Sequence, residues 1–339
     1  MRAVVLHAFG PPENLGIEEV PDPEPGPGEL RIAVGIAGVN VFDTHLRAGA
    51  VPPIYPMPEL PAVLGFEVGG TVDRVGPGVD EVWLGTEVVA HLGIARAGYA
   101  ELAVVPETSV HRVPAGLPPA AALTMLATGR TAVVVIDFAD IGPADVVLVT
   151  AAAGGVGGLI LQEVRNRGAV AVGAARGTAK VDWIRAQGAI GVDYGFPDWP
   201  HVVREELSDR QVTVALDAVG GEVGRQALEL VRPGGSVVLY GWSSGEPTRL
   251  NESDIFGRGL TVSAAFGPRI AMRRPDGVRD FEREALELAA SGRIVAEVRR
   301  LPMSEIAVAH RLLEARETIG KLVLDVAAHG LSATPSAVR

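Results

Sequence analysis

The feature that most restricts how this chain folds is the segment 146–180, VVLVTAAAGGVGGLILQEVRNRGAVAVGAARGTAK. It begins with an apolar run rich in β-branched residues (146–150), passes through a glycine-rich turn into apolar residues at helical spacing, and ends in a second apolar run (169–175). This order predicts a strand, a helix and a second strand. A glycine turn at that place is typical of the βαβ units that bind dinucleotides.

The turn itself predicts a binding site for a pyrophosphate. Glycines let the backbone approach the ligand closely, and the first N–H groups of the helix, together with its dipole, favour an anion. The fingerprint departs from the common one at its first position, where alanine replaces the glycine of the tight turn. We expect cofactor contacts from Ala152, Gly154, Gly155, Val156 and Gly157.

The end of the second strand predicts which dinucleotide binds. NAD-selective sites usually place a carboxylate there, against the ribose 2′-hydroxyl. Here Arg176 follows the strand, Lys180 lies a helical turn further on, and the first carboxylate, Asp182, falls inside the next helix. Cations suit a 2′-phosphate, so the sequence favours NADPH over NADH.

Composition restricts the remaining functions. At 339 residues, 47% of them hydrophobic, the chain is longer than one core usually fills, so we expect two domains. A net charge of -11 argues against nucleic acid or anionic membrane partners. The sequence has no long unbroken apolar run and no signal peptide, which predicts a cytoplasmic protein. It also has no cysteine, so no thiolate can bind zinc.

The chain has two regions with different patterns of apolar residues. Residues 1–120 contain short alternating runs between Gly and Pro turns, which predict a small barrel-like β domain. From Pro119 onward, alanine-rich helical segments alternate with strand-like runs, and this predicts a parallel sheet covered by helices. Segment 260–266, LTVSAAF, is expected to be an edge strand of that sheet. Because an unpaired apolar edge invites a symmetric partner, we expect a homodimer.

An ordered series of blocks runs through nearly the whole length. The blocks are GVNVFDTHLRAG (38–49), LPAVLGFEVGGTVDRVGPGV (60–79), GYAELAVVP (98–106), AAAGGVG (151–157), DAVGG (217–221), RPGGSVVLYG (232–241) and GKLVLDV (320–326). In this order they resemble the medium-chain dehydrogenase/reductases, and among these the zinc-independent quinone oxidoreductases related to zeta-crystallin. The series as a whole is highly specific.

The resemblance implies an α/β architecture of two domains. A GroES-like domain made of residues 1–122 and 267–339 would surround a Rossmann domain made of residues 123–266, with NADPH in the cleft between them. Zinc alcohol dehydrogenases of the same superfamily have Cys at the position of Asn40 and His at the position of Phe66. The resemblance therefore implies a site without a metal ion.

The resemblance also assigns individual residues. It implies that Asn40 and Asp43 lie near the nicotinamide, although Asn and Asp at strand ends also often bond their own backbone. Packing inside a helix or at a strand end is the alternative for Thr128 and Phe266. Further cofactor contacts are implied for Thr128, Lys180, Tyr194, Gly241, Phe266 and Lys321.

The substrate pocket departs from the family pattern. Where relatives often have tyrosines, this chain has His45 and Val51. His45 is the only residue of the first block able to donate a proton near neutral pH, and a plain pocket-lining role fits it equally well. Tyr55 can reach in from its loop, and the sequence does not assign it a place.

These observations predict a reaction class. Without a metal, a saturated alcohol needs another base and electrophile, whereas a quinone or α,β-unsaturated carbonyl accepts a hydride directly. We therefore expect NADPH-dependent reduction of a quinone or related conjugated carbonyl. An enoyl reductase of a polyketide or other secondary-metabolite pathway fits the same residues and differs in needing protonation of the α-carbon. A non-catalytic NADPH-binding structural protein is the alternative of another class.

Overall fold

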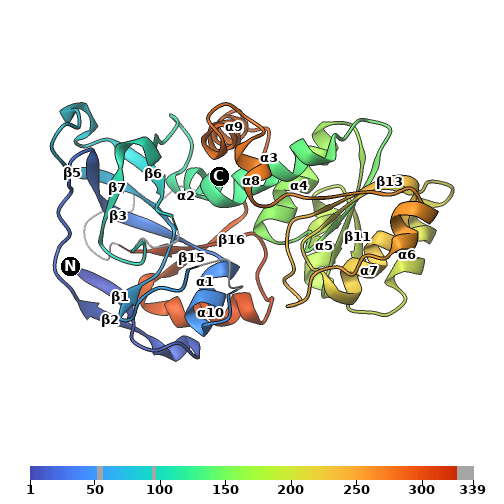
Figure 1. The fold of residues 1–339 in the computed structure, drawn as a ribbon, viewed down its shortest axis with the longest axis horizontal. Coiled ribbons are helices and arrows are strands. Elements are labelled where there is room, and N and C mark those ends of the chain that lie inside the picture. The colour runs from blue at the N-terminus through green and yellow to red at the C-terminus, as the bar shows by residue number, and fades with distance from the viewer. Residues whose placement is uncertain (52–55, 94–96, 327–339) are drawn as a thin grey trace, which may run out of the picture. The chain divides into compact units, whose positions relative to one another are not determined.

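The computed structural model describes residues 1–51, 56–93 and 97–326. The chain divides into two compact units (Figure 1). The first unit contains residues 1–113, 299–317 and those from 322 onward, and the second contains residues 114–298 and 318–321. Tyr55 and the tail that follows Val326 lie outside the described residues.

The second unit is built on a parallel sheet with strand order β11-β10-β9-β12-β13-β14. Its strands are β9 (Val146–Thr150), β10 (Val170–Ala175), β11 (Ile190–Asp193), β12 (Val212–Asp217), β13 (Val231–Leu239) and β14 (Thr261–Ala264). In chain order this is the 3-2-1-4-5-6 arrangement of a Rossmann domain, so the predicted fold is confirmed. The order reverses between β9 and β12, and such sheets bind ligands at the carboxyl ends of the two strands where the order reverses.

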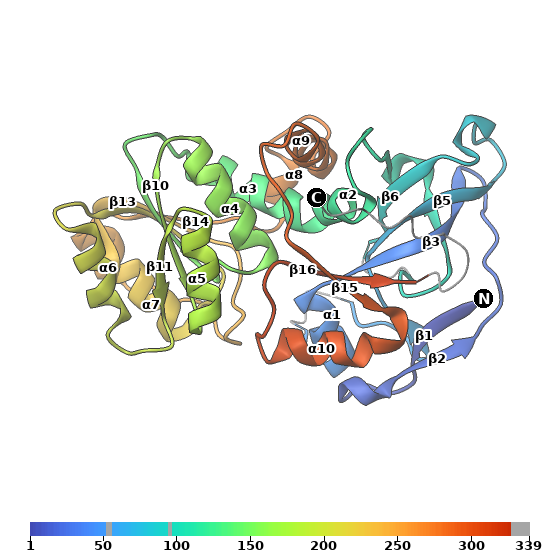
Figure 2. The same cartoon turned by 180° about the vertical axis from the view of Figure 1, so that it is seen from behind.

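Helices cover both faces of this sheet (Figure 2). Helices α4 (Gly155–Asn166) and α5 (Thr178–Ala186) join β9 to β10 and β10 to β11. The chain then runs through α6 (Trp199–Leu207) to β12 and through α7 (Gly221–Leu230) to β13. Right-handed crossovers in opposite directions put the two pairs of helices on opposite faces. Strand β9 is buried along its whole length because both of its faces are covered.

A long helical segment precedes the sheet. It consists of α2 (Pro119–Thr124), a π-helical turn (Met125–Gly129) and α3 (Arg130–Ala139). By length and hydropathy this segment passes as a membrane span, but 72% of its most apolar window is buried inside the fold. Helix α9 (Val278–Ala290) packs against it. The apolar composition is therefore that of a core helix.

The borders between the units differ from the expected ones at both sides: residues 114–122 cluster with the second unit, and the larger difference lies at the carboxyl side. Residues 267–298, which include α8 (Pro268–Ala271) and α9, cluster with the second unit rather than the first. The cause is packing, because Phe281 and Ala285 of α9 are fully buried. A Cβ added to Gly129 would lie 3.2 Å from the Ala285 Cβ, so the helices meet closely at a glycine.

The first unit is β-rich, as the sequence predicts. Its larger sheet has the order β15-β16-β3-β5-β6-β8, with β7 also paired to β3, and its smaller sheet has the order β2-β1-β4. The bounds are β1 (Arg2–Leu6), β2 (Leu15–Glu19), β3 (Glu29–Val39), β4 (Ala62–Val63), β5 (Glu67–Val75), β6 (Glu87–His91), β7 (Leu102–Pro106), β8 (Val110–Arg112), β15 (Val298–Pro302) and β16 (Lys321–Asp325). Helices α1 (Val41–Ala48) and α10 (Ile306–Glu314) pack against each other beside the sheets.

Candidate functional site

The turn between β9 and α4 reverses the chain at Ala151. This residue has a left-handed backbone with φ 50°, whereas Ala152 is fully buried and its N–H donates to the Ala174 carbonyl over 3.1 Å. The left-handed backbone that favours glycine is therefore at Ala151, one residue before Ala152, where the sequence placed the missing turn glycine. A Cβ at Gly157 would lie 2.5 Å from the Ala151 carbonyl oxygen, so glycine there lets the helix pack onto the turn.

The amino end of α4 is not capped. Gly154 occupies the N-cap position and has no side chain to accept a hydrogen bond. Within residues 1–51, 56–93 and 97–326, the N–H groups of Gly155, Val156 and Gly157 have no hydrogen-bond acceptor. Three unsatisfied N–H groups at the positive end of a helix dipole fit a phosphate, and the pyrophosphate of a dinucleotide fits this place.

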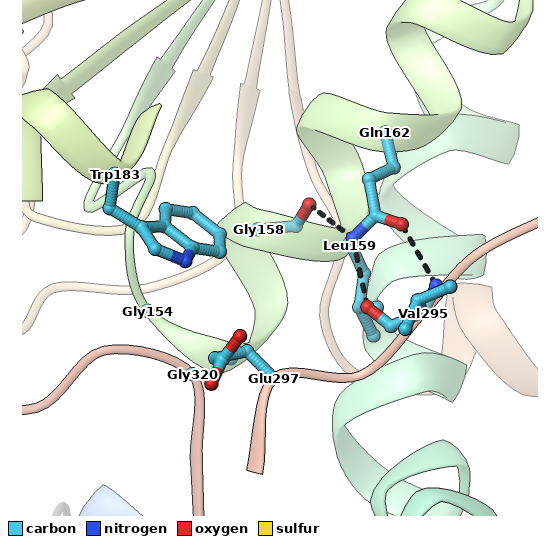
Figure 3. A pocket seen from close by; sticks show the side chains of 9 residues that line it. Gly154, Gly158, Leu159, Gln162, Trp183, Val295, Glu297 and Gly320 are labelled. Atoms are coloured by element: carbon cyan, nitrogen blue, oxygen red, sulfur yellow. Dashed lines mark hydrogen bonds between the residues drawn. The ribbon is translucent and has the colours of Figure 1, made fainter. Parts of the chain in front are cut away.

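A small pocket opens at this end of α4 (Figure 3). Trp183 lies against Gly158, where a Cβ would come within 2.9 Å of the indole ring. On the other side, Gln162 accepts a hydrogen bond from the Val295 N–H over 2.8 Å and donates one to the Val295 carbonyl over 2.9 Å. The lining residues are Gly154, Gly155, Gly158, Leu159, Gln162, Trp183, Val295, Glu297 and Gly320, all from the second unit.

The residues expected at the adenosine end lie beyond β10 and β11. The Arg176 side chain is exposed and has no hydrogen-bond or ion-pair partner among the residues whose structure is described. Asp193, the last residue of β11, accepts hydrogen bonds from the Gly177 N–H at 3.0 Å and the Gly195 N–H at 2.7 Å. The carboxylate thereby ties together the two loops that carry Arg176 and Tyr194, while Lys180 and Tyr194 are half-buried.

A buried carboxylate organises the carboxyl ends of β9 and β12. Asp217 is 1% exposed, and its Oδ1 accepts hydrogen bonds from the Thr150 hydroxyl at 2.6 Å and the Val219 N–H at 3.0 Å. Its Oδ2 accepts from the Thr248 hydroxyl at 2.5 Å and the Gly220 N–H at 3.1 Å. The sequence did not point to Thr150 or Thr248. The pattern that marks Asp217 in the sequence is its place at the end of a strand, shortly before two glycines.

The loop after β13 is held against the loop after β12. The Ser243 N–H donates to the Ala218 carbonyl at 3.0 Å, and a Cβ at Gly241 would lie 2.9 Å from that same carbonyl oxygen. The ring of Phe266, just beyond β14, lies 5.3 Å from the ring of Trp242. Gly241 and Phe266 thus lie at the same edge of the sheet as Asp217.

Two further expected residues lie near the α4 terminus. Thr128, 5% exposed, belongs to the π-helical turn, and its Cγ2 is 3.0 Å from where a Gly155 Cβ would lie. Gly320 donates its N–H to the Ala153 carbonyl at 2.9 Å, which holds Lys321, 4% exposed, next to the turn. The structure therefore brings Thr128, the glycine turn and Lys321 together.

In the first unit, Asn40 is the N-cap of α1 and is held by two buried carboxylates. Asp43 and Asn40 form a reciprocal capping box, in which Asp43 Oδ2 accepts from the Asn40 N–H at 2.7 Å. Asn40 Nδ2 donates to Glu67 Oε2 at 3.1 Å. Asp43, Glu67 and Tyr99 are all 0% exposed. Burial, and then the negative charges of Asp43 and Glu67, raise the pKa of Tyr99. Asp43 thus has a positioning role in this geometry, and Glu67 was missed from the sequence.

His45 lies half-buried on α1. Burial lowers the pKa of His45, and the nearby negative charge of Glu314 opposes that shift. The neutral imidazole is therefore the main form near pH 7. Arg47, the neighbouring cation of the block, is 2% exposed and paired with Glu314 and the Gly10 carbonyl. His45 is thus half-buried, whereas the other two titratable side chains of α1, Asp43 and Arg47, are buried.

Of the two positions that the resemblance compares with zinc ligands, Asn40 is the N-cap of α1 and Phe66 packs among aromatic rings. Phe66 is 7% exposed and lies 5.6 Å from the Phe42 ring and 6.3 Å from the His91 ring, measured between centroids. Among the described residues, no group of three or more His, Asp or Glu side chains is arranged to hold a metal ion. This part of the first unit thus contains the Asn40 amide next to the Asp43 and Glu67 carboxylates, with the aromatic ring of Phe66 nearby.

Comparison with known proteins agrees with both units. Residues 26–115 match the alcohol dehydrogenase GroES-like domain, and residues 186–324 match the zinc-binding dehydrogenase family. A 2-haloacrylate reductase from a Burkholderia species is 31% identical, with 96% of this chain and 98% of that protein covered. The Escherichia coli quinone oxidoreductase complexed with NADPH is 26% identical, with a TM-score of 0.82 over 96% of this chain and all of that one. An NAD-dependent alcohol dehydrogenase structure is 32% identical, with a TM-score of 0.83 over 96% of this chain and 100% of that one.

The Rossmann sheet, the GroES-like β domain and the glycine turn define an oxidoreductase of the medium-chain dehydrogenase/reductase class. Within that class, the chain belongs to the family that includes the quinone oxidoreductases.

Proposed function

We propose that this protein reduces a quinone or a related conjugated carbonyl with NADPH, without a metal ion. The observation that carries the proposal is the uncapped amino end of α4, with its three unsatisfied N–H groups, in the same unit as the unpaired cation Arg176. The first suits a pyrophosphate and the second a 2′-phosphate. Similarity to an enzyme solved with NADPH supports the same cofactor.

The chain's residues fall into three roles. Gly155, Val156 and Gly157 bind the pyrophosphate through backbone N–H groups, and Arg176, Lys180 and Tyr194 bind the adenosine phosphate. Thr128, Gly241, Phe266 and Lys321 line the place of the nicotinamide, and Asn40 and His45 contribute from the first unit. When bound, NADPH supplies a hydride. Asn40 and Thr128 then stabilise the negative charge that develops on the carbonyl oxygen by hydrogen bonds.

A second candidate function is the reduction of an enone or acrylate carbon–carbon double bond. Similarity to a 2-haloacrylate reductase favours it. This reaction needs a proton at the α-carbon, and His45 is the candidate donor. Because burial lowers the pKa of His45, this donor would work better as the pH falls towards that lowered pKa.

The test is an acceptor panel followed by loss of NADPH absorbance, with and without a chelator. We expect quinones or enones to be reduced at unchanged rate after chelation. With 4-deuterated NADPH of the correct face, an enone should carry the label at its β-carbon. Oxidation of simple saturated alcohols with neither acceptor class reduced would contradict the proposal, and saturable NADPH binding without any turnover would favour a non-catalytic role.

The variant His45→Phe separates the two candidate reactions. If His45 donates the proton, kcat with an enone should fall about 10²- to 10⁴-fold, the usual scale of general acid catalysis. Quinone reduction should fall much less, because hydroquinone oxygens take protons from water. Equal and small effects on both would indicate that His45 only lines the pocket.

We also propose a homodimer formed through β14. This strand is the end of the described sheet order, and two of its four residues are exposed. A symmetric second copy would satisfy its open edge. Light scattering should give twice 35.3 kDa at micromolar concentration, and a monomer mass would contradict the proposal.

A further inference from the structure

Glu67 is a carboxylate that is completely buried inside the first unit. It begins β5, lies opposite Gly38 of β3 in the antiparallel register, and is 0% exposed. Burying a carboxylate is costly unless hydrogen bonds stabilise its charge. One of these bonds comes from the side-chain amide of Asn40, two residues after Gly38, where β3 has ended and α1 begins.

Gly38 makes the room for this carboxylate. A Cβ at position 38 would lie 2.4 Å from Glu67 Oε2, closer than real Cβ atoms approach, and 3.3 Å from Glu67 Cβ, which is a tight contact. Gly38 does not have a positive φ, so the requirement for glycine there is space rather than backbone conformation. Gly38 and Asn40 belong to one sequence block and Glu67 to another, and the three residues thus depend on one another in the folded chain.

The chemistry of a carboxylate determines how the Asn40 amide is turned. An ionised carboxylate only accepts hydrogen bonds, so the amide must present its nitrogen to Glu67. The backbone of Asn40 is held as well, because its N–H donates to Asp43 Oδ2 at 2.7 Å and its carbonyl accepts from the Asp43 N–H at 3.1 Å. The backbone that carries the side chain is therefore fixed, and the amide nitrogen has Glu67 as its partner.

We propose that Glu67 is a positioning residue that orients the Asn40 carboxamide for its work at the reactive end of the cofactor, and that Gly38 is required because it leaves space for Glu67. The inference rests on the proposed role of Asn40. Glu67 itself need not contact cofactor or substrate, because it acts through Asn40.

The test uses five variants of the full-length protein and one control. Glu67→Ala removes the acceptor, Glu67→Gln keeps an isosteric acceptor, and Gly38→Ala displaces the carboxylate without changing it. Asn40→Ala and the double variant Asn40→Ala/Glu67→Ala close a double-mutant cycle. The control is Gly35→Ala on the same strand, where the nearest atom to an added Cβ is 3.7 Å away.

We expect Glu67→Ala and Gly38→Ala each to lower kcat with a simple benzoquinone by about tenfold or more, the scale of a lost charge-assisted hydrogen bond. Glu67→Gln should stay within about threefold of the parent and Gly35→Ala should be unchanged, because neither loses the acceptor. The double variant should be no slower than Asn40→Ala alone, since Glu67 acts through that residue.

A readout that does not depend on turnover is the pair of Asn40 side-chain amide protons in the NMR spectrum of the cofactor-free protein. Their chemical shifts should differ widely in the parent and in Glu67→Gln, and should converge in Glu67→Ala and Gly38→Ala. Unchanged shifts, or additive losses in the cycle, would overturn the inference. If instead Asn40→Ala leaves kcat unchanged while the shifts respond as expected, the proposed role of Asn40 fails and the orienting role of Glu67 stands. If Glu67→Ala does not fold, Gly38→Ala and Glu67→Gln decide the outcome.

Discussion

Two helices of this protein begin beside residues assigned to the site, and their amino ends are built in opposite ways. Helix α4 has Gly154 as its N-cap, with no capping side chain and three unsatisfied N–H groups. Helix α1 has Asn40 as its N-cap, inside a reciprocal capping box and next to two fully buried carboxylates. An open helix end binds an anion from outside, whereas a closed one holds its own residues in place. The amino end of α4 therefore suits the binding of a ligand, and the amino end of α1 holds the side chains of its own unit in place.

The largest effect should come from closing the open end. Gly157→Val would put a side chain 2.5 Å from the Ala151 carbonyl oxygen, which is backbone and cannot move aside. We expect a loss of stability of about 3 kcal/mol, at the upper end of overpacking costs, together with loss of NADPH binding. Thermal unfolding and fluorescence titration measure both. The matched change Gly154→Ala, whose nearest contact would be 3.2 Å, should cost much less stability, and equal losses would argue against packing as the cause.

Removing the exposed cation should give the next largest effect. Arg176→Ala should weaken NADPH binding by about 1.5 to 3 kcal/mol, roughly ten- to a hundredfold, and leave NADH nearly unchanged. Titration of both cofactors measures the difference. Arg185→Ala, in α5 of the same unit, serves as the control; its guanidinium lies 3.9 Å from Asp182 and donates to the Gly191 carbonyl at 3.1 Å. Equal weakening of both cofactors by Arg176→Ala would mean that its side chain acts through the fold.

The closed polar core of the first unit should be sensitive to acid. His310 of α10 is fully buried against Tyr99, and neither ring nitrogen has a hydrogen-bond partner among the described residues. Burial, with a smaller contribution from the Arg47 charge, lowers the pKa of His310 to about 3. The unfolded chain then binds the proton first, so stability falls by about 1.4 kcal/mol for each pH unit below about 6.5 and stops falling near the folded pKa.

Denaturant unfolding between pH 7 and 5 tests this dependence. His310→Leu should flatten the decline, while His201→Leu, at a side chain 69% exposed, should leave it as in the parent. A decline that persists unchanged in His310→Leu would assign the acid sensitivity to other groups.

The smallest effect should come from removing the charge of Asp43 at the capped amino end of α1 while keeping the shape of the side chain. Asp43→Asn can still accept the Asn40 N–H, so it should lose only the charge–dipole part, about 0.3 to 1 kcal/mol. Asp43→Ala also loses the cap and should cost about 0.5 to 2 kcal/mol more. Chemical unfolding of the two variants gives the comparison. If they are equally stable, the capping box contributes nothing and α1 is held by packing alone.

Most of the fold could be predicted from local patterns. The apolar runs and the glycine turn at 146–180 predicted the βαβ unit, because strand and helix periodicities and turn residues act within a few positions of each other. The exposed cation after β10 was predictable for the same reason, since its place depends on the end of one strand. The NADPH selectivity that follows from Arg176 stays a prediction.

Contacts between residues far apart in the chain were decided by the tertiary structure alone. The bond from Asn40 to Glu67, the two threonines that hold Asp217, and the packing that assigns 267–298 to the second unit join elements whose separation no periodicity reports. The sequence by itself determined which side chains and glycines were available and in which elements they lie. Only the folded chain decided which of them share a buried space, because burial and pairing depend on the packing of every element at once.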